Sequence, residues 1–218
     1  MPEIKDTKKY TFTVEGETEK WYFDWLEEQI NQCETAKCKA SIIAKVQQNP
    51  SKFAKTQAAS ATPTITHICD VESNEPVHVQ KFKDILDRLS EANKVKKIQY
   101  GLGYSNFTFE LWISLHKVNC NGPLSHRTQY LTYINKAFDE NFEDLQHYKK
   151  KDNFKRCLSK LTLDDVKSAI KRSQTIMNNN ASDPGKRLIK YKKFEYYPDN
   201  PSLTIWESVK KILDECGV

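Results

Sequence analysis

Apolar and polar residues in the first half of the chain follow two periods in turn. Tyr10, Phe12 and Val14 alternate with threonines, which is the period of a β-strand, and this strand ends at Glu15. A helix is predicted immediately afterwards, because apolar residues then recur about once per turn and leave acidic positions to solvent. The apolar stripe of this helix consists of Trp21, Tyr22, Trp25, Leu26 and Ile30.

The alternation of strand and helix then repeats. Strands are predicted at residues 40–46, 64–69 and 97–102, and a helical pattern follows each of them. Pro50 suits the first turn of the second helix, and Asn106 is placed to cap the fourth. The order β-α-β-α-β-α-β-α predicts an α/β fold, in which a mostly parallel sheet is flanked by helices and ligands bind beyond the carboxyl ends of the strands.

The second half of the chain has a different pattern. Residues 127–177 show helical periodicity throughout, and the polar segment 178–186, which contains Asp-Pro-Gly, predicts a turn. A terminal helix is predicted around residues 203–213. Because no low-complexity linker separates the halves, we expect an α/β core at residues 1–125 and a helical, basic part at residues 126–218 that packs onto it.

Composition limits the class of protein. At 218 residues with 38% hydrophobic content, the chain is long enough for one domain with a real core. No apolar run approaches the roughly 20 residues that cross a bilayer, and the N-terminus lacks the apolar region of a secretory signal, so we expect a soluble, cytoplasmic protein without a membrane partner. The six cysteines form no C-x-x-C pair and are interpreted as reduced thiols. A zinc site that uses His116, Cys120 or the pair Cys33 and Cys38 matches no usual ligand spacing.

Positive charge is concentrated late in the chain. Residues 149–193 contain 14 Lys and Arg against 4 Asp and Glu, whereas residues 1–110 contain 15 against 16. Such a segment suits a nucleic acid, since cations that neutralise phosphates release counterions, and the alternative is a solvated helical face. The candidate nucleic-acid-binding residues are Lys149, Lys150, Lys151, Lys155, Arg156, Lys171, Arg172, Lys186, Arg187, Lys190, Lys192 and Lys193.

Aromatic residues are interspersed with these cations. Aromatic rings can stack on unpaired bases, so the mixture favours RNA or a single-stranded substrate, although packing in the core explains half of the aromatics equally well. The aromatic residues concerned are Tyr148, Phe154, Tyr191, Phe194, Tyr196 and Tyr197.

Carboxylates follow two of the predicted strands. Glu15 ends the first strand, and Asp70 and Glu72 follow the third. If these strands are parallel and adjacent, the three carboxylates converge at one edge of the sheet, and the gap of one residue points Asp70 and Glu72 to the same side of an extended backbone. Magnesium prefers such oxygen ligands. Gly16 lacks a Cβ and would let a phosphate or the chain approach closely.

Two further acids begin the first helix. Glu17 and Glu19 lie in its first turn, where negative charge complements the helix macrodipole and Thr18 can act as a cap. This structural interpretation is preferred for both, and Glu19 is retained as a further candidate for the site.

Three stretches of the chain resemble a known family. "VEGETEKWYF" (14–23), "SNFTFELWISLH" (105–116) and "NPSLT" (200–204) are similar, in this order, to the V-E-G-x-T-E-x-x-Y-F, S-N-P-x-F-E-x-W-x-x-x-H and N-P-S-T elements of RloB-like proteins. These proteins are part of the TOPRIM superfamily, the topoisomerase–primase fold. Its pattern is a glutamate after the first strand and D-x-D after a later one.

The resemblance implies a site with two departures from the pattern. Glu15 and Asp70 match the family positions, whereas Glu72 replaces the second aspartate and Phe107 replaces the proline after Asn106. Glutamate keeps the oxygen ligands but reaches one methylene further. In this interpretation Asp70 and Glu72 hold Mg²⁺ or Mn²⁺, and Glu15 binds the metal or acts as general base.

The resemblance also implies an activity and a setting. It implies a metal-dependent nuclease that cleaves RNA or DNA in phage defence by abortive infection, beside an ATPase partner of the ABC or AAA type. Glu110, near the start of the fourth helix, is expected to reach the same cleft, whereas His116 is interpreted as a structural histidine.

Other functions stay open at this point. One is a non-catalytic nucleic-acid- or effector-binding module that partners an ATPase and whose metal site has drifted, as Glu72 suggests. Another is nucleotidyl transfer related to that of primases. Association into a homo-oligomer is left open as well.

Overall fold

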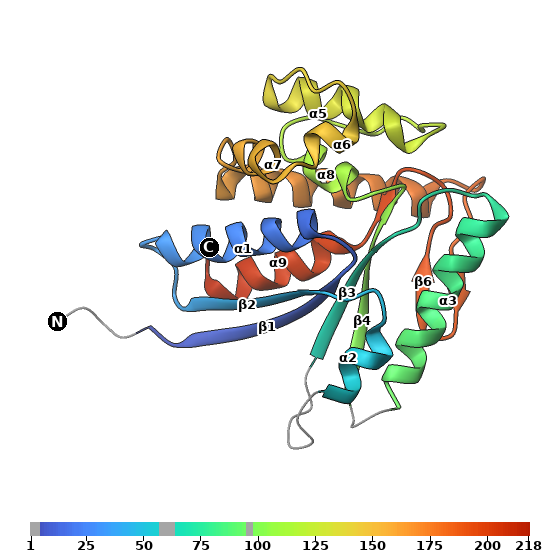
Figure 1. Ribbon diagram of the computed structural model, residues 1–218, viewed down its shortest axis with the longest axis horizontal. Helices are drawn as coiled ribbons and strands as arrows, with labels where there is room; N and C mark the ends of the chain where they lie inside the picture. The colour runs from blue at the N-terminus through green and yellow to red at the C-terminus, as the bar shows by residue number, and fades with distance from the viewer. Residues whose placement is uncertain (1–4, 57–63, 95–97) are drawn as a thin grey trace.

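The computed structural model describes residues 5–56, 64–94 and 98–218, and a five-stranded sheet lies at its centre (Figure 1). Its strands are β1 (Thr7–Val14), β2 (Lys39–Val46), β3 (Thr64–Asp70), β4 (Gln99–Asn106) and β7 (Ser202–Leu203). The spatial order is β2-β1-β3-β4-β7, with the first four strands parallel and β7 antiparallel to β4. The α/β fold and mostly parallel sheet predicted from the sequence are confirmed. Residue 97, the predicted start of the fourth strand, lies outside the described residues.

Helices cover both faces of the sheet. Those of the first half are α1 (Glu17–Gln32), α2 (Pro50–Thr56), α3 (Pro76–Ala92) and α4 (Glu110–Leu115). On one face, Phe12 of β1 stacks on Phe23 of α1 with ring centroids 4.2 Å apart. On the other, Phe82 of α3 packs edge-on against Tyr104 of β4. Successive side chains of a strand point to opposite faces, so the strands contribute to two separate cores.

The second half of the chain is mainly helical. It contains a 3₁₀ turn η1 (Arg127–Gln129), α5 (Tyr130–Phe138), α6 (Leu145–Tyr148), α7 (Lys151–Leu158), α8 (Leu163–Ser182), α9 (Ile205–Cys216) and a hairpin of β5 (Ile189–Tyr191) and β6 (Phe194–Tyr196). The predicted helical character of residues 127–177 and the terminal helix are confirmed. The predicted division at residues 125 and 126 stays a prediction. It places β7 and α9 in the helical part, although β7 extends the sheet and α9 packs against it.

The turn predicted at residues 178–186 is partly wrong. Helix α8 continues to Ser182, because Asn180 is buried and its amide donates to the Pro201 carbonyl at 2.9 Å. A tertiary hydrogen bond therefore outweighs the low helix propensity of three consecutive asparagines. The hairpin and β7 were not predicted.

The predicted cap at Asn106 is wrong. Strand β4 runs through Asn106, and α4 begins only at Glu110. The Asn106 amide donates instead to the Pro198 carbonyl at 2.7 Å, and the Asn200 amide donates to the Asn106 carbonyl. The peptide bonds between Asn106 and Phe107 and between Asn200 and Pro201 are both cis. The N-P-S segment is thus attached to the carboxyl end of β4.

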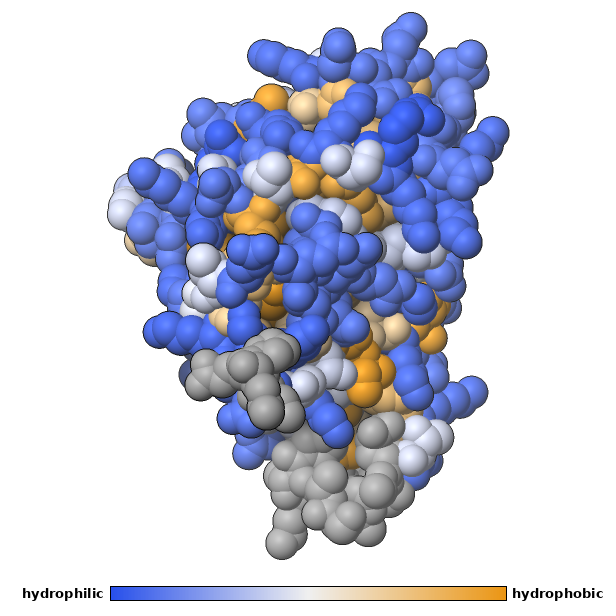
Figure 2. Space-filling view, turned by 90° about the vertical axis from the view of Figure 1, so that its left-hand side faces the viewer, coloured by the Kyte–Doolittle hydropathy of each residue, from blue (hydrophilic) through white to orange (hydrophobic). Residues whose placement is uncertain are grey.

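Hydrophilic side chains cover most of the face drawn in Figure 2, with hydrophobic residues visible only in small patches. Large hydrophobic side chains that are exposed include Ile43 and Val46 of β2, Val77 of α3, and Leu188. None of the described helices is long and apolar enough to cross a membrane.

Candidate metal centre

Glu15 and Asp70 meet at the carboxyl edge of the sheet. Strands β1 and β3 are parallel neighbours with Val14 in register with Ile68, so the residues that follow them emerge together. A carboxylate oxygen of Glu15 accepts a hydrogen bond from the Asp70 backbone N–H at 3.1 Å. The sheet topology therefore brings together the two acids that the strand pattern predicted.

Two more acids reach the same place from helices. Glu19, in the first turn of α1, is only 5% exposed and accepts a hydrogen bond from the Thr18 hydroxyl at 2.9 Å. Glu110, the first residue of α4, is 1% exposed, and one of its carboxylate oxygens lies 3.0 Å from the Lys149 ammonium at the end of α6. We call Glu15, Glu19, Asp70 and Glu110 the acidic cluster.

The acids of the cluster perturb one another. Burial raises the pKa of Asp70 well above its usual range, and the charges of Glu19, Glu15 and Glu110 raise it further, whereas Lys149 lowers it. Burial likewise raises the pKa of Glu19, against the hydrogen bonds of its own N–H and of Thr18. Burial raises the pKa of Glu15 to about 7, although the Asp70 N–H and Lys81 lower it. The cluster therefore favours protons or a bound cation over bare carboxylates.

The cluster stabilises the charged form of Lys149. Burial alone would lower its pKa, but the charges of Glu110, Asp70 and Glu19 raise it by more. The neighbouring Tyr148 hydroxyl is fully buried and has no hydrogen-bond partner among the described residues. Burial raises the pKa of this hydroxyl, and the charges of Glu110, Cys157 and Glu19 raise it further.

Glu72 does not point where the sequence predicted. Strand β3 ends at Asp70, and Glu72 has φ 66°, so the backbone between them is not extended. One oxygen of Glu72 pairs with the Lys81 ammonium and the other lies 3.0 Å from the His78 ring, both on α3. Although burial acts in the other direction, the hydrogen bond from Lys81 lowers the pKa of Glu72, with further contributions from His78 and Arg127. Glu72 and Glu15 nevertheless line one cavity of about 760 Å³ beside α3.

The donor set fits a hard divalent cation in chemistry, because it consists of carboxylate oxygens in a partly desolvated site with too few cations. Its side chains are not closed around a single point. Across residues 5–56, 64–94 and 98–218, no three His, Cys, Asp or Glu side chains form a ready metal-binding group. Binding of an ion would therefore require carboxylate side chains to rotate.

Gly16 has a local steric role. Its φ of −141° is extended, so the backbone conformation does not require glycine. A Cβ at this position would lie 2.9 Å from a carboxylate oxygen of Glu19, so the missing side chain makes room for the cluster. A close approach of phosphate at Gly16 stays a prediction.

His116 has structural partners. Its Nδ1 donates to the Trp112 carbonyl at 2.9 Å, and its Nε2 lies 3.2 Å from the Tyr22 hydroxyl. Burial lowers its pKa to about 4. His116 therefore stays neutral in the folded protein at neutral pH, and both ring nitrogens have partners away from the carboxylates.

The predicted basic residues fall into two separate groups. Lys149, Lys150, Lys151, Lys155 and Arg156 belong to α6 and α7, beside α1, whereas the group from Lys186 to Lys193 surrounds the hairpin beside α3 (Figure 1). Lys171 and Arg172 lie on α8 between them, and Arg172 donates to the carbonyls of Leu115 and His116. The residues therefore do not form one continuous face.

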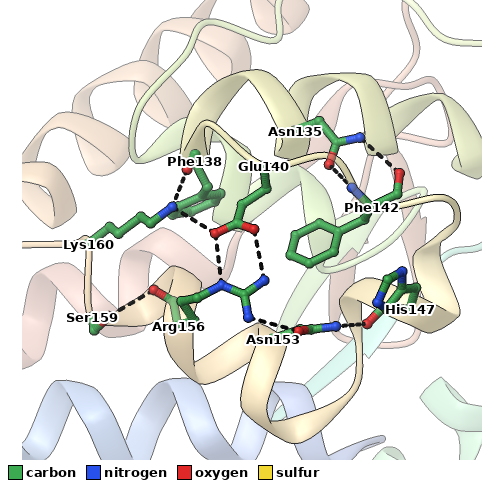
Figure 3. Close-up of polar contacts among 9 residues, drawn as sticks. All are labelled: Asn135, Phe138, Glu140, Phe142, His147, Asn153, Arg156, Ser159 and Lys160. Atoms are coloured by element: carbon green, nitrogen blue, oxygen red, sulfur yellow. Dashed lines mark hydrogen bonds and ion pairs between the residues drawn. The ribbon is translucent and has the colours of Figure 1, made fainter.

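Several of these cations already have acidic partners. Arg156 donates two hydrogen bonds to Glu140, at 3.0 and 2.8 Å, and Lys160 joins the same carboxylate at 2.7 Å (Figure 3). Lys190 lies 3.3 Å from Glu195, and Lys192 lies 3.5 Å from Asp87. In the part of the chain that the structure describes, no ion pair is recorded for Lys150, Lys151, Lys155, Lys171 or Arg187.

The expected stacking platform is wrong. Tyr148, Phe154, Phe194, Tyr196 and Tyr197 are all buried, and only Tyr191 is half-buried. Core packing accounts for these rings, so they provide no argument for RNA or for single strands.

Sequence reasoning undervalued Glu19 and Lys149. Glu19 was assigned to helix chemistry, yet it precedes the buried Tyr22 and Phe23 by three and four residues and so lies on the buried stripe. That spacing could have placed it in the site. For Lys149 no local signal existed, because its partner Glu110 lies 39 residues earlier in the chain.

Comparison with known proteins agrees with the motifs. The family model for RloB-like proteins matches residues 10–212, which is nearly the whole chain. No curated protein and no solved structure gives a significant match. The chain therefore belongs to the RloB-like protein family, a TOPRIM-like group.

Proposed function

We propose that this protein is a Mg²⁺- or Mn²⁺-dependent nuclease that hydrolyses phosphodiester bonds of RNA or DNA. One observation carries the proposal: Glu15, Glu19, Asp70 and Glu110 converge at the carboxyl edge of the sheet, where Lys149 pairs with Glu110. Such an arrangement costs stability in the folded protein, which is typical of a functional site.

The residues divide the work as follows. Asp70, Glu15 and Glu19 would hold the cation, which when bound lowers the pKa of water and neutralises charge on a phosphate. Where Glu15 leaves the ion to Asp70 and Glu19, burial, which raises its pKa to about 7, suits it instead to accept a proton near neutral pH. Lys149 is 33% exposed and can offer its ammonium to a phosphate oxygen while Glu110 orients it.

The biological setting is part of the same proposal. We extend the proposal to phage defence by abortive infection, with an ABC- or AAA-type ATPase as partner and nucleic acid as substrate. Self-association is left open.

A second candidate is a non-catalytic nucleic-acid- or effector-binding module. Glu72 favours it, because the residue at the second acidic position is engaged by Lys81 and His78. The absence of a closed metal-binding group among the described residues points the same way.

Cleavage assays separate the two. Purified protein should cleave labelled RNA or DNA with Mg²⁺ or Mn²⁺ and not with EDTA, and Asp70→Asn and Glu15→Gln should each lower the rate by about 100-fold or more. Cleavage that survives both substitutions would reject this site. Binding without cleavage under every condition would favour the second candidate.

A further inference from the structure

Two lysines lie at opposite sides of the acids at the sheet edge. Lys149 approaches from α6 and pairs with Glu110, whereas Lys81 approaches from α3 and pairs with Glu72. Both also act on the acids between them, since Lys81 lowers the pKa of Glu15 and Lys149 lowers that of Asp70.

These two cations do not balance the charge. If all five ionised, Glu15, Glu19, Asp70, Glu72 and Glu110 would still exceed Lys81, Lys149 and Arg127, the cation that also acts on Glu72, by two charges. Each lysine is thus held by attraction to several carboxylates. A divalent cation among the acids would weaken this attraction on both sides, because the same carboxylates would interact with the ion.

Both lysines can reach a ligand. The side chain of Lys81 is 56% exposed and lines the 760 Å³ cavity together with Arg88, Gln80 and Gln48. The side chain of Lys149 is one-third exposed. Ammonium, guanidinium and amide donors of this kind bind phosphate oxygens. Among the described residues that line this cavity, none has an aromatic side chain that could stack on a base.

We infer that Lys81 and Lys149 are metal-released phosphate contacts: they neutralise the carboxylates while no cation is bound, and they bind the phosphate backbone of the substrate once a cation replaces them. The inference rests on the proposed function and deepens it. The inference makes the binding of the cation and of nucleic acid cooperative. A bound cation frees the lysines for phosphate, and a bound phosphate takes the lysines away from the carboxylates that attract the cation. The inference also gives Glu72 a role as a tether for Lys81 instead of a metal ligand.

The test measures binding, not cleavage. Affinity for a short fluorescein-labelled DNA duplex and for the matching RNA is measured by anisotropy with EDTA and with Ca²⁺, while Ca²⁺ binding is followed by calorimetry. In the wild type, Ca²⁺ should tighten nucleic acid binding about tenfold. Lys81→Ala should remove most of this gain, and Lys83→Ala is the matched control, because Lys83 lies over the Tyr191 ring on another face of α3.

Glu72→Gln provides a second, independent readout. This variant releases Lys81, so it should tighten nucleic acid binding in EDTA by about three- to tenfold. It should also reduce the gain in nucleic acid affinity that Ca²⁺ produces, while the affinity for Ca²⁺ itself stays unchanged. If Glu72 were a ligand, Ca²⁺ affinity would fall instead, and the inference would be overturned. Since Lys149→Ala would leave the buried Glu110 unpaired, that side is tested with the double variant Glu110→Gln, Lys149→Met, which should also reduce the gain.

The outcomes distinguish the two proposals. The inference would be overturned, and the nuclease proposal left intact, if Ca²⁺ binds without any gain in nucleic acid affinity. The same holds if the gain persists in both Lys81→Ala and the double variant Glu110→Gln, Lys149→Met. If neither Ca²⁺ nor Mg²⁺ binds the wild-type protein, both fall.

Discussion

Single residues at the sheet edge show which part of the site is predictable. Glu15 and Asp70 could be paired from the sequence because parallel strands end at one edge, and their contact of 3.1 Å follows from that topology. The orientation of Glu72 could not be predicted, since it depends on the positive φ of Glu72 itself and on partners from α3.

Asp70 should cost the protein stability when no metal is present. Its raised pKa means that the folded state binds a proton that the unfolded state releases, so its contribution to stability declines as pH rises above the unfolded pKa near 4. We expect Asp70→Asn to raise the free energy of unfolding in EDTA by about 1 to 3 kcal/mol at pH 8, and by less at pH 5. Urea unfolding at both pH values measures this.

The same experiment with Mg²⁺ provides the control. The ion should stabilise the wild type more at pH 8 than at pH 6, because protons compete for the same oxygens, and it should not stabilise Asp70→Asn. A variant that is less stable than the wild type in EDTA would contradict the charge repulsion described for the cluster.

Burial of neutral His116 should make the protein less stable in mild acid. Burial lowers its pKa to about 4, so between roughly pH 6.5 and 4 the unfolded state binds a proton that the folded state does not. Stability should therefore fall as pH drops through this window, by about 2 to 4 kcal/mol for this residue. A His116→Gln variant should be less stable at pH 7 but show a flatter dependence between pH 7 and 4.5 in urea titrations. An unchanged slope would contradict the assignment.

At the level of elements, the periodicity predicted each strand and helix of the first half, but not how they pack. Gly103 of β4 is an example. A Cβ there would lie 2.6 Å from the Ile68 side chain, whereas the Ile205 Cα at 3.6 Å would be an ordinary contact, so the absence of a side chain makes room for Ile68 of β3. Nothing in the sequence around Gly103 signals this, because the partner residues are far away along the chain.

Gly103→Val should therefore destabilise the fold by about 1 to 3 kcal/mol, because it overfills the space that the Ile68 side chain occupies. The matched control is Gly101→Val, since a Cβ at Gly101 would meet only the Thr66 hydroxyl, at an ordinary 3.7 Å. Thermal unfolding of the two variants measures the difference. Equal losses would show that the cost comes from glycine replacement in a strand and not from the contact with Ile68.

At the scale of the whole molecule, one asparagine connects the second half to the sheet. The side-chain amide of Asn200 donates to the Asn106 carbonyl and to the Tyr130 hydroxyl, and its Oδ1 accepts from the Leu124 N–H at 2.9 Å. The resemblance pointed to the N-P-S segment as important without showing why. The reason is that it holds β7 beside β4 and ties α5 to the end of that strand.

Charge distribution is the other property of the whole molecule. The sequence suggested one continuous basic face, which the folded protein does not have. A net excess of cations from residue 149 to 193 suggested one binding face, but folding separates the α6–α7 group from the hairpin group and pairs several members with acids. Only the α6–α7 group adjoins the acidic cluster, through Lys149. Backbone phosphates of a substrate in the site should therefore contact this group.

The triple variant Lys150→Ala, Lys151→Ala, Lys155→Ala should weaken binding to DNA by about the same factor for every sequence. It should also lower the slope of log affinity against log salt by about 2 to 3, since each lost phosphate contact removes close to one unit. Lys190→Ala with Lys192→Ala should change the slope by less than one unit, because Glu195 and Asp87 already hold these cations. Anisotropy titrations over a salt series compare the two variants. An equal effect of both variants would mean that the hairpin also contacts the phosphate backbone of the nucleic acid. A substrate path from the acidic cluster across α8 would then replace the path expected along α7.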